Sequence, residues 1–267
     1  MHKKVIKSAP PLVSIITPSY NQGQFIEATI LSVLNQTYKN IQYIVIDGGS
    51  TDDTMDVINK YQEKIDIVIH EKDKGQSDAI NKGFKLAKGE LVGWINSDDI
   101  LYPDCVEEIV KLYQVNNDGA VYYGSILDRI DADGKLITRK NVLISDKLYL
   151  LNHNYDVIQQ GSFYPIELIK RVNYVDESIH YCMDLDLWLR LLQHGPIYAY
   201  KMKPIAGFRT WEATKTSTGT IKFLRDIKKT LLKHGAPMYS KTLLKIYYYS
   251  FKSHVKSVLT RFYLLSS

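Results

Sequence analysis

The sequence has few cysteines and no long hydrophobic segment. Its 267 residues include two cysteines, Cys105 and Cys182, without a CxxC pair, so a disulfide framework and a structural zinc site are both poor interpretations. No stretch of 18 apolar residues occurs, and the lysines before Pro10 are not followed by the apolar segment of a signal peptide. We therefore expect a cytoplasmic protein that is neither secreted by this route nor threaded through a membrane.

Two common nucleotide-binding motifs are also absent. The sequence contains neither GxGxxG nor GxxxxGK(S/T), which weakens dinucleotide-binding and P-loop interpretations and leaves nucleotide binding by another geometry open. With 45% apolar residues, 24% charged residues and 8 prolines, the composition is that of a folded globular protein. The length fits one large domain, or one domain with a small appendage.

Charge is distributed unevenly along the chain. Residues 221–267 contain ten basic residues and one acidic residue, so they carry a formal charge of +9, and residues 1–220 carry −4. Apolar and aromatic side chains are interleaved with these bases, which is typical of basic amphipathic helices. We expect residues 219–267 to form a basic amphipathic helical tail on an acidic body.

Short β-branched runs alternate with segments of helical periodicity over the first hundred residues. The runs lie at residues 12–17, 41–46, 65–70 and 91–95, and the helical segments lie at 25–34, 51–61 and 77–87. This alternation predicts an α/β fold with a mainly parallel central sheet flanked by helices. Further on, residues 121–130 and 135–138 predict a hairpin, and residues 184–193 predict an amphipathic helix.

Polar clusters follow the four predicted strands, at residues 17–21, 47–51, 71–78 and 96–99. Open parallel sheets bind their ligands at the carboxyl ends of the strands, because the loops there converge on a crevice. We therefore expect these four loops to form one ligand site.

Three aspartates in these loops each have two interpretations. Asp98 and Asp99 leave an apolar strand together, and two close carboxylates favour a divalent cation, but aspartate is also a favoured N-cap for the segment that follows. Asp47 precedes Gly-Gly-Ser, where it would either recognise a hydrogen-bond donor on a nucleobase or stabilise a turn. The residues alone do not decide between these roles.

A second pair of carboxylates, Asp184 and Asp186, lies at the start of the predicted helix at 184–193. Both favour the positive end of the helix dipole. Asp186 stands four residues before Arg190, so an ion pair on the helix surface is its simplest role. Asp184, at the mouth of the helix, is placed to act as a general base if it faces a cleft.

The order of these elements is more specific than any one of them. The segments VSIITPSYNQGQFIEATILSVLNQTYKNIQYIVIDGGSTDDT and HEKDKGQSDAINKGFKLAKGELVGWINSDDILYPD closely resemble family 2 glycosyltransferases of the GT-A fold. The segments QQGSFYPIELIKRVNYVDESIHYCMDLDLWLRLLQHG and FRTWEATKTS resemble that family's acceptor side. The resemblance covers about residues 11–218. It implies a GT-A domain at 1–218, with a donor-binding half at about 11–100 and an acceptor half at 101–218, before the tail at 219–267.

The resemblance also implies a donor site and a metal. The positions that match the family's donor-binding residues are Thr17, Pro18, Tyr20, Asp47, Lys74, Asp78, Asn96, Ser97 and Asp98. Asp98, with Asp99 next to it, matches the carboxylate that holds Mn²⁺ or Mg²⁺ against the donor diphosphate. Two positions depart from the family pattern: Asn96 stands where many members have aspartate, and Trp211 lies where many members have a histidine metal ligand.

By the same resemblance, Asp184 matches the general base of the family's inverting enzymes, and Asp186 is the fallback for that role. The implied function is inverting, metal-dependent transfer of a sugar from a nucleotide-sugar, UDP-sugar in the first instance, to a glycan or lipid-linked acceptor in the synthesis of a surface polysaccharide such as capsule or lipopolysaccharide. The alternative is a catalytically idle module that binds a nucleotide-sugar or a membrane surface.

The tail at 219–267 has two main interpretations. A basic amphipathic helix with aromatic residues can lie on an anionic membrane surface, here the inner leaflet, where the protein would be peripheral. Alternatively, the helices pack back on the acidic body and leave their bases in solvent. We do not expect nucleic acid as a partner, since no recognised motif accompanies the charge.

Overall fold

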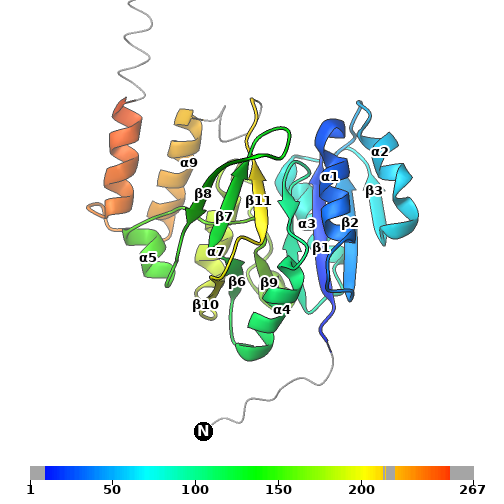
Figure 1. Ribbon diagram of the computed structural model, residues 1–267. Helices are drawn as coiled ribbons and strands as arrows, with labels where there is room; N and C mark the ends of the chain where they lie inside the picture. The colour runs from blue at the N-terminus through cyan, green and yellow to red at the C-terminus, as the bar shows by residue number, and fades with distance from the viewer. Residues whose placement is uncertain (1–9, 213, 215–219, 253–267) are drawn as a thin grey trace, which may run out of the picture.

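The computed structural model describes residues 10–212, 214 and 220–252 (Figure 1). Its first half is built on four parallel strands, β1 (Val13–Ser19), β2 (Ile41–Asp47), β3 (Ile67–His70) and β4 (Leu91–Trp94). They lie in the order β3-β2-β1-β4, with β1 in the middle. The predicted parallel sheet is confirmed, and each predicted strand is found within two residues of its expected ends.

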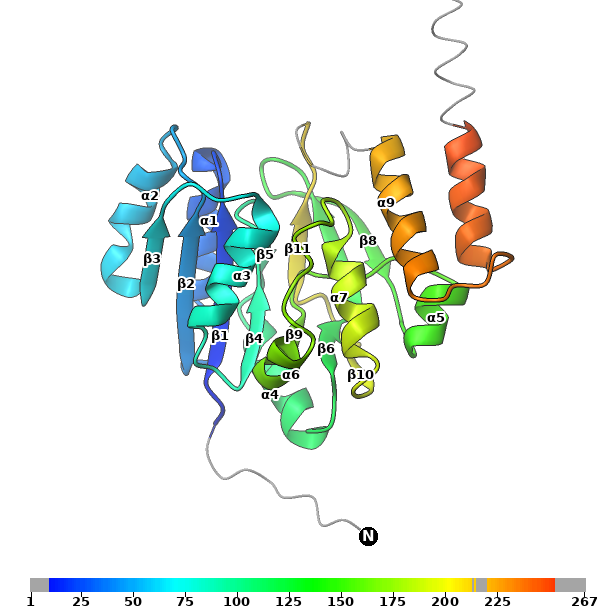
Figure 2. The same ribbon diagram turned by 180° about the vertical axis from the view of Figure 1, so that it is seen from behind.

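Helices cover both faces of this sheet. Helix α1 (Gly23–Leu34) packs beside α2 (Thr54–Lys60) on the face seen in Figure 1, and a short 3-10 turn (Gln62–Lys64) leads into β3. Helix α3 (Gln76–Leu86) covers β1 and β2 on the other face, seen in Figure 2. Because both faces are covered, β1 and β2 read as continuous apolar runs in the sequence and are almost fully buried.

The same sheet continues into the second half of the chain. Strand β9 (Phe163–Pro165) runs antiparallel to β4 and to β6 (Val121–Gly124), and β10 (Ile197–Tyr200) pairs in parallel with β6 at the edge. The full order is β10-β6-β9-β4-β1-β2-β3. The sheet is therefore mainly parallel, as predicted, with β9 as its one antiparallel strand among the described residues.

A second, four-stranded sheet has the order β5-β11-β7-β8. Its strands are β5 (Ile100–Leu101), β11 (Ala206–Arg209), β7 (Ile126–Ile130) and β8 (Leu136–Asn141). The predicted hairpin is the β7–β8 pair, but the predicted strand at 121–130 is wrong as a single strand. It breaks at buried Ser125, whose N–H bonds the carbonyl of Tyr200 in the large sheet (2.8 Å) while its carbonyl accepts from Val142 N beside the small sheet (2.8 Å).

Four further helices follow in the second half. They are α4 (Cys105–Val115), α5 (Lys147–Asn152), α6 (Ile166–Arg171) and α7 (Met183–Leu191). Helix α7 is the predicted helix at 184–193, and its buried Trp188 donates from Nε1 to the phenol oxygen of Tyr164 in β9 (2.9 Å). A short connection joins the end of α7 to the start of β10. Helix α7 therefore begins toward the edge of the sheet where the parallel strands have their carboxyl ends.

Two antiparallel helices complete the described chain, α9 (Thr220–Lys233) and a helix at 241–252 (Figure 2). Leu224, Ile227, Leu231, Leu243 and Ile246 of these helices are buried in the same hydrophobic core as the central sheet. One face of the predicted tail therefore packs on the body. Among the described residues, no helix is both long and apolar enough to span a membrane.

Candidate functional site

The loops after β1 and β2 are joined by reciprocal hydrogen bonds. Asn21 donates from its backbone N–H to Ser50 Oγ (2.8 Å), and Thr51 N–H donates to Asn21 Oδ1 (2.9 Å). Asn21 has φ of 50°, in the left-handed region that asparagine tolerates better than most residues. This backbone geometry turns the chain away from β1 and places its side chain against the neighbouring loop.

The other two loops are joined to the same edge. A Cβ on Gly48 would lie 2.4 Å from Asp73 Oδ2, so the backbone of the loop after β2 closely approaches a side chain of the loop after β3. Gln76 Nε2 then donates to Asn96 Oδ1 (2.8 Å), which joins the loop after β3 to the one after β4. The four loops predicted to form one site are thus in contact, each with the next.

Asp47 is buried and holds its own loop together. Its carboxylate accepts from Gly49 N (3.1 Å), Ser50 N (2.8 Å) and Ser50 Oγ (2.5 Å), and it lies 2.6 Å from His70 Nδ1. The turn-stabilising role left open by the sequence is therefore observed. Recognition of a nucleobase by Asp47 stays a prediction.

The predicted donor residues at the end of β1 differ in exposure. Thr17 is buried, with its hydroxyl 3.0 Å from the phenol oxygen of Tyr43, and Pro18 is buried beside it, whereas Tyr20 is 59% exposed. Ser19, which the sequence reasoning missed, has a buried Oγ without a hydrogen-bond partner among the described residues. A buried orphaned hydroxyl requires an explanation, and a ligand that supplies the partner is one.

Lys74 and Asp78 lie where α3 begins. Lys74 is exposed, and its backbone N–H donates to Asp78 Oδ2 (3.0 Å). Partial burial would raise the pKa of Asp78, but the hydrogen bond from Lys74 and the charge of Lys82 outweigh it and lower the pKa. Asp78 is therefore a fixed negative charge in the first turn of α3, and Lys74 leaves its side chain in solvent.

Asp99 is fully buried and its carboxylate is saturated by the protein. Oδ1 accepts from Arg209 N (2.8 Å), and Oδ2 accepts from Gln160 Nε2 (2.9 Å) and Asn96 Nδ2 (3.2 Å). Burial and the negative charge of Asp98 raise the pKa of Asp99 well above its usual range. Because Asp99 is fully buried and both of its carboxylate oxygens already accept hydrogen bonds, a metal ion could reach it only if neighbouring residues moved, so Asp99 is the weaker of the two predicted ligands.

Asp98 is partly exposed, and among the described residues Trp211 is the one side chain that donates a hydrogen bond to its carboxylate. Its Oδ2 accepts from Trp211 Nε1 (3.1 Å), and its backbone carbonyl accepts from Arg209 Nε (2.8 Å). Burial raises the pKa of Asp98, against the hydrogen bond from Trp211 and the charge of Arg209. The N-cap role considered for this pair is wrong, because the next helix, α4, begins at Cys105 after Asp104.

Arg209 and Gln160 are two further site residues that the sequence did not reveal. Arg209 is buried, donates to the carbonyls of Asp131 (3.0 Å) and Ala132 (2.7 Å), and lies over the ring of Phe25. Trp211 packs edge-on against the same ring. The available signal was the position of Arg209 and Gln160 in the two acceptor-side segments.

Of the two predicted metal ligands, Asp98 is the one whose carboxylate is partly exposed, so a divalent cation at this site would be held through Asp98. The described residues contain no group of three or more His, Cys, Asp or Glu side chains placed to hold a metal ion. Trp211 lies at the Asp98 carboxylate as a hydrogen-bond donor, and an indole N–H is not a metal ligand. A cation here would depend on oxygen atoms of a bound diphosphate for its remaining ligands.

In the second pair of carboxylates, as in the first, one side chain is fully buried and the other is partly exposed. Asp186 is fully buried, bonded to Arg190 Nε (2.7 Å) of its own helix and to His234 Nε2 (2.8 Å) and Lys233 Nζ (3.2 Å) from the end of α9. Burial would raise the pKa of Asp186, but these cationic and hydrogen-bonding partners lower it far below its usual range. The predicted ion pair with Arg190 is confirmed, but its expected place on the helix surface is wrong, because Asp186 is fully buried among structural contacts.

Asp184 remains partly exposed in the first turn of α7. Its Oδ1 accepts from Leu185 N (2.8 Å), and its negative charge adds to the effect of burial in raising the pKa of Tyr164. It is therefore close to β9, the strand beside β4. Of the two candidates for the general base, Asp184 is the one whose side chain is partly exposed to solvent.

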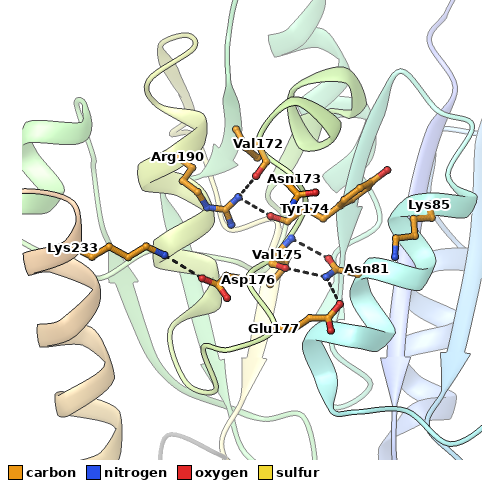
Figure 3. A pocket seen from close by; sticks show the side chains of 10 residues that line it. All are labelled: Asn81, Lys85, Val172, Asn173, Tyr174, Val175, Asp176, Glu177, Arg190 and Lys233. Carbon is orange, nitrogen blue, oxygen red and sulfur yellow. Dashed lines mark hydrogen bonds and ion pairs between the residues drawn. The ribbon is translucent and has the colours of Figure 1, made fainter.

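A cavity of about 490 Å³ lies behind this region, between α3, the segment at 172–177, α7 and α9 (Figure 3). Its lining includes Arg190, which donates to the carbonyls of Val172 (2.6 Å) and Tyr174 (2.7 Å), and Lys233, which bonds Asp176 (3.1 Å). None of the predicted site residues lines it. The cavity is separate from the site formed by the four loops.

The chain belongs to glycosyl transferase family 2. The family model of that description matches residues 14–171, which is more than half of the chain. An uncharacterized glycosyltransferase of Rickettsia typhi is 32% identical over 219 residues, covering 78% of this chain and 67% of that protein. An uncharacterized glycosyltransferase of Rickettsia bellii is 35% identical over 201 residues, covering 72% of this chain and 29% of that protein. The chondroitin synthase of Escherichia coli is 31% identical over 205 residues, covering 73% and 29%. The match thus spans less than a third of two of these relatives.

Solved structures show the fold. S. aureus TarS 1–349 in complex with UDP-GlcNAc superposes with a TM-score of 0.68 at 16% identity, covering 89% of this chain and 70% of that one. The mannosyltransferase PcManGT from Pyrobaculum calidifontis, in complex with GDP-Man and Mn²⁺, gives a TM-score of 0.66 at 16% identity, covering 91% and 70%. The predicted GT-A α/β fold is confirmed.

Proposed function

We propose that this protein is an inverting, metal-dependent glycosyltransferase that moves a sugar from a nucleotide-sugar, a UDP-sugar, to a hydroxyl of a glycan or lipid-linked acceptor in cell-surface polysaccharide synthesis. The observation that carries the proposal is the meeting of four loops at one sheet edge, with the accessible carboxylate of Asp98 among them. Family membership, and neighbours of the same fold that bind UDP-GlcNAc and GDP-Man, support a nucleotide-sugar as the donor.

The donor would bind along the loops after β1 to β4. Tyr20 offers an exposed ring, Ser19 a buried hydroxyl that has no hydrogen-bond partner in the described part of the chain, and Lys74 a cation in solvent. The ring of Tyr20 suits stacking on a nucleobase, and the hydroxyl of Ser19 suits a hydrogen bond to the ribose or to the edge of the base. The positive charge of Lys74 suits the diphosphate. Asp47 and Asn96 would act by holding the loops in place, because their side chains bond neighbouring loop residues.

Asp98 would hold a divalent cation, Mn²⁺ or Mg²⁺, through the oxygen that Trp211 does not occupy. When bound, the cation would neutralise negative charge on the nucleoside diphosphate. Asp99 would support Asp98 from behind, since its three hydrogen bonds fix the loop to Gln160, Asn96 and the backbone of β11. PcManGT, solved with GDP-Man and Mn²⁺, is a neighbour of the same fold.

Asp184 would accept the proton of the acceptor hydroxyl as that oxygen attacks the anomeric carbon from the face opposite the diphosphate. A single displacement inverts the configuration of the sugar. A positioned base of this kind contributes about 10²- to 10⁴-fold to the rate. The salt bridges of Asp186 would keep α7, and with it Asp184, in place on the sheet.

The acceptor and the location complete the proposal. We propose that the acceptor is presented at the cytoplasmic face of the membrane, where the basic C-terminal helices would keep the protein peripheral. Their charge supports this, because ten bases and one acid lie between residues 221 and 267.

The test is donor turnover by the purified chain. UDP-sugars are supplied one at a time with and without Mn²⁺, and release of UDP is measured for the wild type and for Asp184→Asn. We expect Mn²⁺-dependent release that the variant loses while it keeps its UDP-induced thermal stabilisation. Stabilisation by UDP without turnover of any donor would instead favour the catalytically idle binding module. The hydrogen bond from Trp211 to Asp98 is the observation in favour of that alternative, because it occupies the predicted metal ligand.

A further inference from the structure

We infer that the helix at 241–252 docks on an anionic lipid surface through one defined face. We call this the outward face. It consists of five exposed side chains of the helix, most of them three or four residues apart, and it extends to two exposed residues of the preceding loop. The helix residues are Lys241, Leu244, Tyr248, Phe251 and Lys252, and the loop residues are Met238 and Tyr239. The inference names the membrane contact that the proposed location requires, and its test does not depend on catalysis.

The helix is apolar on two opposite sides. Leu243 and Ile246 point into the core and are at most 1% exposed, whereas Leu244, Tyr248 and Phe251 are 53%, 61% and 70% exposed. Single exposed apolar residues are ordinary, but a stripe aligned at helical spacing is typical of a surface that something covers. The inward side alone would explain a helix packed on a globular body, so the outward stripe needs a second partner.

The charge around the stripe favours an anionic partner. No acidic residue follows Asp226 in the sequence, and Lys241 and Lys252 stand exposed at the two ends of the outward face. Helix α9 runs alongside and adds to this charge, since Lys228 Nζ lies 4.6 Å from the ring centroid of Tyr247. Lysines beside an anionic bilayer contribute about 1 kcal/mol each, and aromatic rings suit its interface. A second copy of this chain would bring the same positive charge against the face.

The helix is also placed to bring the site to that surface. Its C-terminal end lies at the edge of the molecule where β1 and β2 have their carboxyl ends, as Figures 1 and 2 both show. Docking through the whole outward face would lay this side of the molecule along the lipid, with the C-terminal end of the face at the level of the four-loop edge. An acceptor whose head group extends from the bilayer would then approach that edge from the side.

The experiment is co-sedimentation of the full chain, without donor, with phosphatidylcholine vesicles that contain or lack phosphatidylglycerol. The test variant is Tyr248→Ser with Phe251→Ser, and the matched control is Leu136→Ser with Leu148→Ser, which removes two side chains of similar exposure from elsewhere. Circular dichroism verifies the fold of each. We expect binding that requires phosphatidylglycerol and falls about tenfold or more in the test variant, with the control unchanged.

Failure of wild-type binding, or equal loss in both double variants, would overturn the inference. So would sedimentation-velocity data without lipid in which the wild type is a dimer and the test variant a monomer, because the face would then join two copies. Asp184→Asn should bind vesicles as the wild type does. Loss of turnover and loss of docking therefore report separately on the proposed function and on this surface.

Discussion

The donor-side loop and helix α7 each carry two aspartates close together in sequence, and in each pair the two carboxylates have opposite surroundings. Asp99 and Asp186 are fully buried and saturated with partners, whereas Asp98 and Asp184 stay partly exposed. In both places the buried member fixes the element that carries the exposed one. A site of this kind positions each accessible carboxylate through a neighbour that no substrate touches.

The two buried members are held by different chemistry. Asp99 accepts from two side-chain amides and a backbone N–H, all neutral, and burial with the nearby charge of Asp98 raises its pKa. Asp186 lies among Arg190, Lys233 and His234, which lower its pKa in spite of burial. Among the described residues, the hydrogen-bond donors to Asp99 thus carry no charge, whereas the charge of Asp186 is compensated by Arg190 and Lys233.

The largest effect should come from Asp184→Asn. Removing the base while keeping the shape should lower the rate of sugar transfer by about 10²- to 10⁴-fold, because the acceptor hydroxyl loses its proton acceptor. Steady-state transfer assays measure this, with UDP affinity by calorimetry as the control for an intact donor site. A transfer rate within about threefold of the wild type would show that Asp184 is not the general base.

Asp186→Asn should act on stability. Removing one partner of a buried charge network costs about 3 kcal/mol or more, and for a chain of this size that lowers the melting temperature by roughly 6–12 °C. Thermal unfolding followed by circular dichroism measures the change. An unchanged melting temperature, with transfer abolished, would instead make Asp186 the catalytic member of the pair.

The stability difference between the wild type and Asp186→Asn should also depend on pH. Because the folded-state pKa of Asp186 is lowered, its stabilising contribution is present above the unfolded carboxyl pKa of about 4 and is lost as the pH falls toward the folded-state value. The stability difference between wild type and Asp186→Asn should be constant from about pH 5 to 7 and shrink below about pH 4. Urea unfolding at a series of pH values measures it, and a difference that grows on acidification would contradict the assignment.

Asp98→Asn should weaken Mn²⁺-dependent binding of UDP by about tenfold or more, since the described residues contain no group of three or more His, Cys, Asp or Glu side chains that could hold the ion in its place. Thermal stabilisation by UDP, measured with and without Mn²⁺, gives the effect. Asp99→Asn serves as the comparison, because it should lower the melting temperature in the absence of any nucleotide. Equal Mn²⁺ responses in Asp98→Asn and the wild type would remove Asp98 from the metal site.

The smallest effect should come from Trp211→Phe, which keeps a ring against Phe25 and removes the N–H donated to Asp98. A hydrogen bond to a charged group contributes about 1.5–3 kcal/mol, and a bound cation would recover part of this loss. We expect a modestly lower melting temperature without metal and a larger stabilisation by Mn²⁺ with UDP. If the variant lost more stability than expected for one hydrogen bond, and Mn²⁺ with UDP did not reduce that loss, the role of Trp211 would be to pack against Phe25 and not to act on Asp98.

The sequence predicted the donor-side half closely and the other half in part. Strands and helices up to Trp94 were found where periodicity placed them, and their loops meet as expected. The hairpin boundary was missed because the break at Ser125 depends on Tyr200 and Val142, two backbone partners far along the chain. Gln160 and Arg209 were not assigned, because their contacts with Asp99 span 61 and 110 residues.

By itself, the sequence determined the alternation of strands and helices, the edge at which ligands should bind and the aspartates worth considering, among them the two pairs Asp98 with Asp99 and Asp184 with Asp186. These follow from local patterns: β-branched runs, helical spacing and polar residues where strands end. Only the tertiary structure decided which aspartate in each pair is accessible, and that Trp211 lies on Asp98. Burial and charge compensation depend on what long-range packing brings beside a carboxylate, and local sequence does not contain that information.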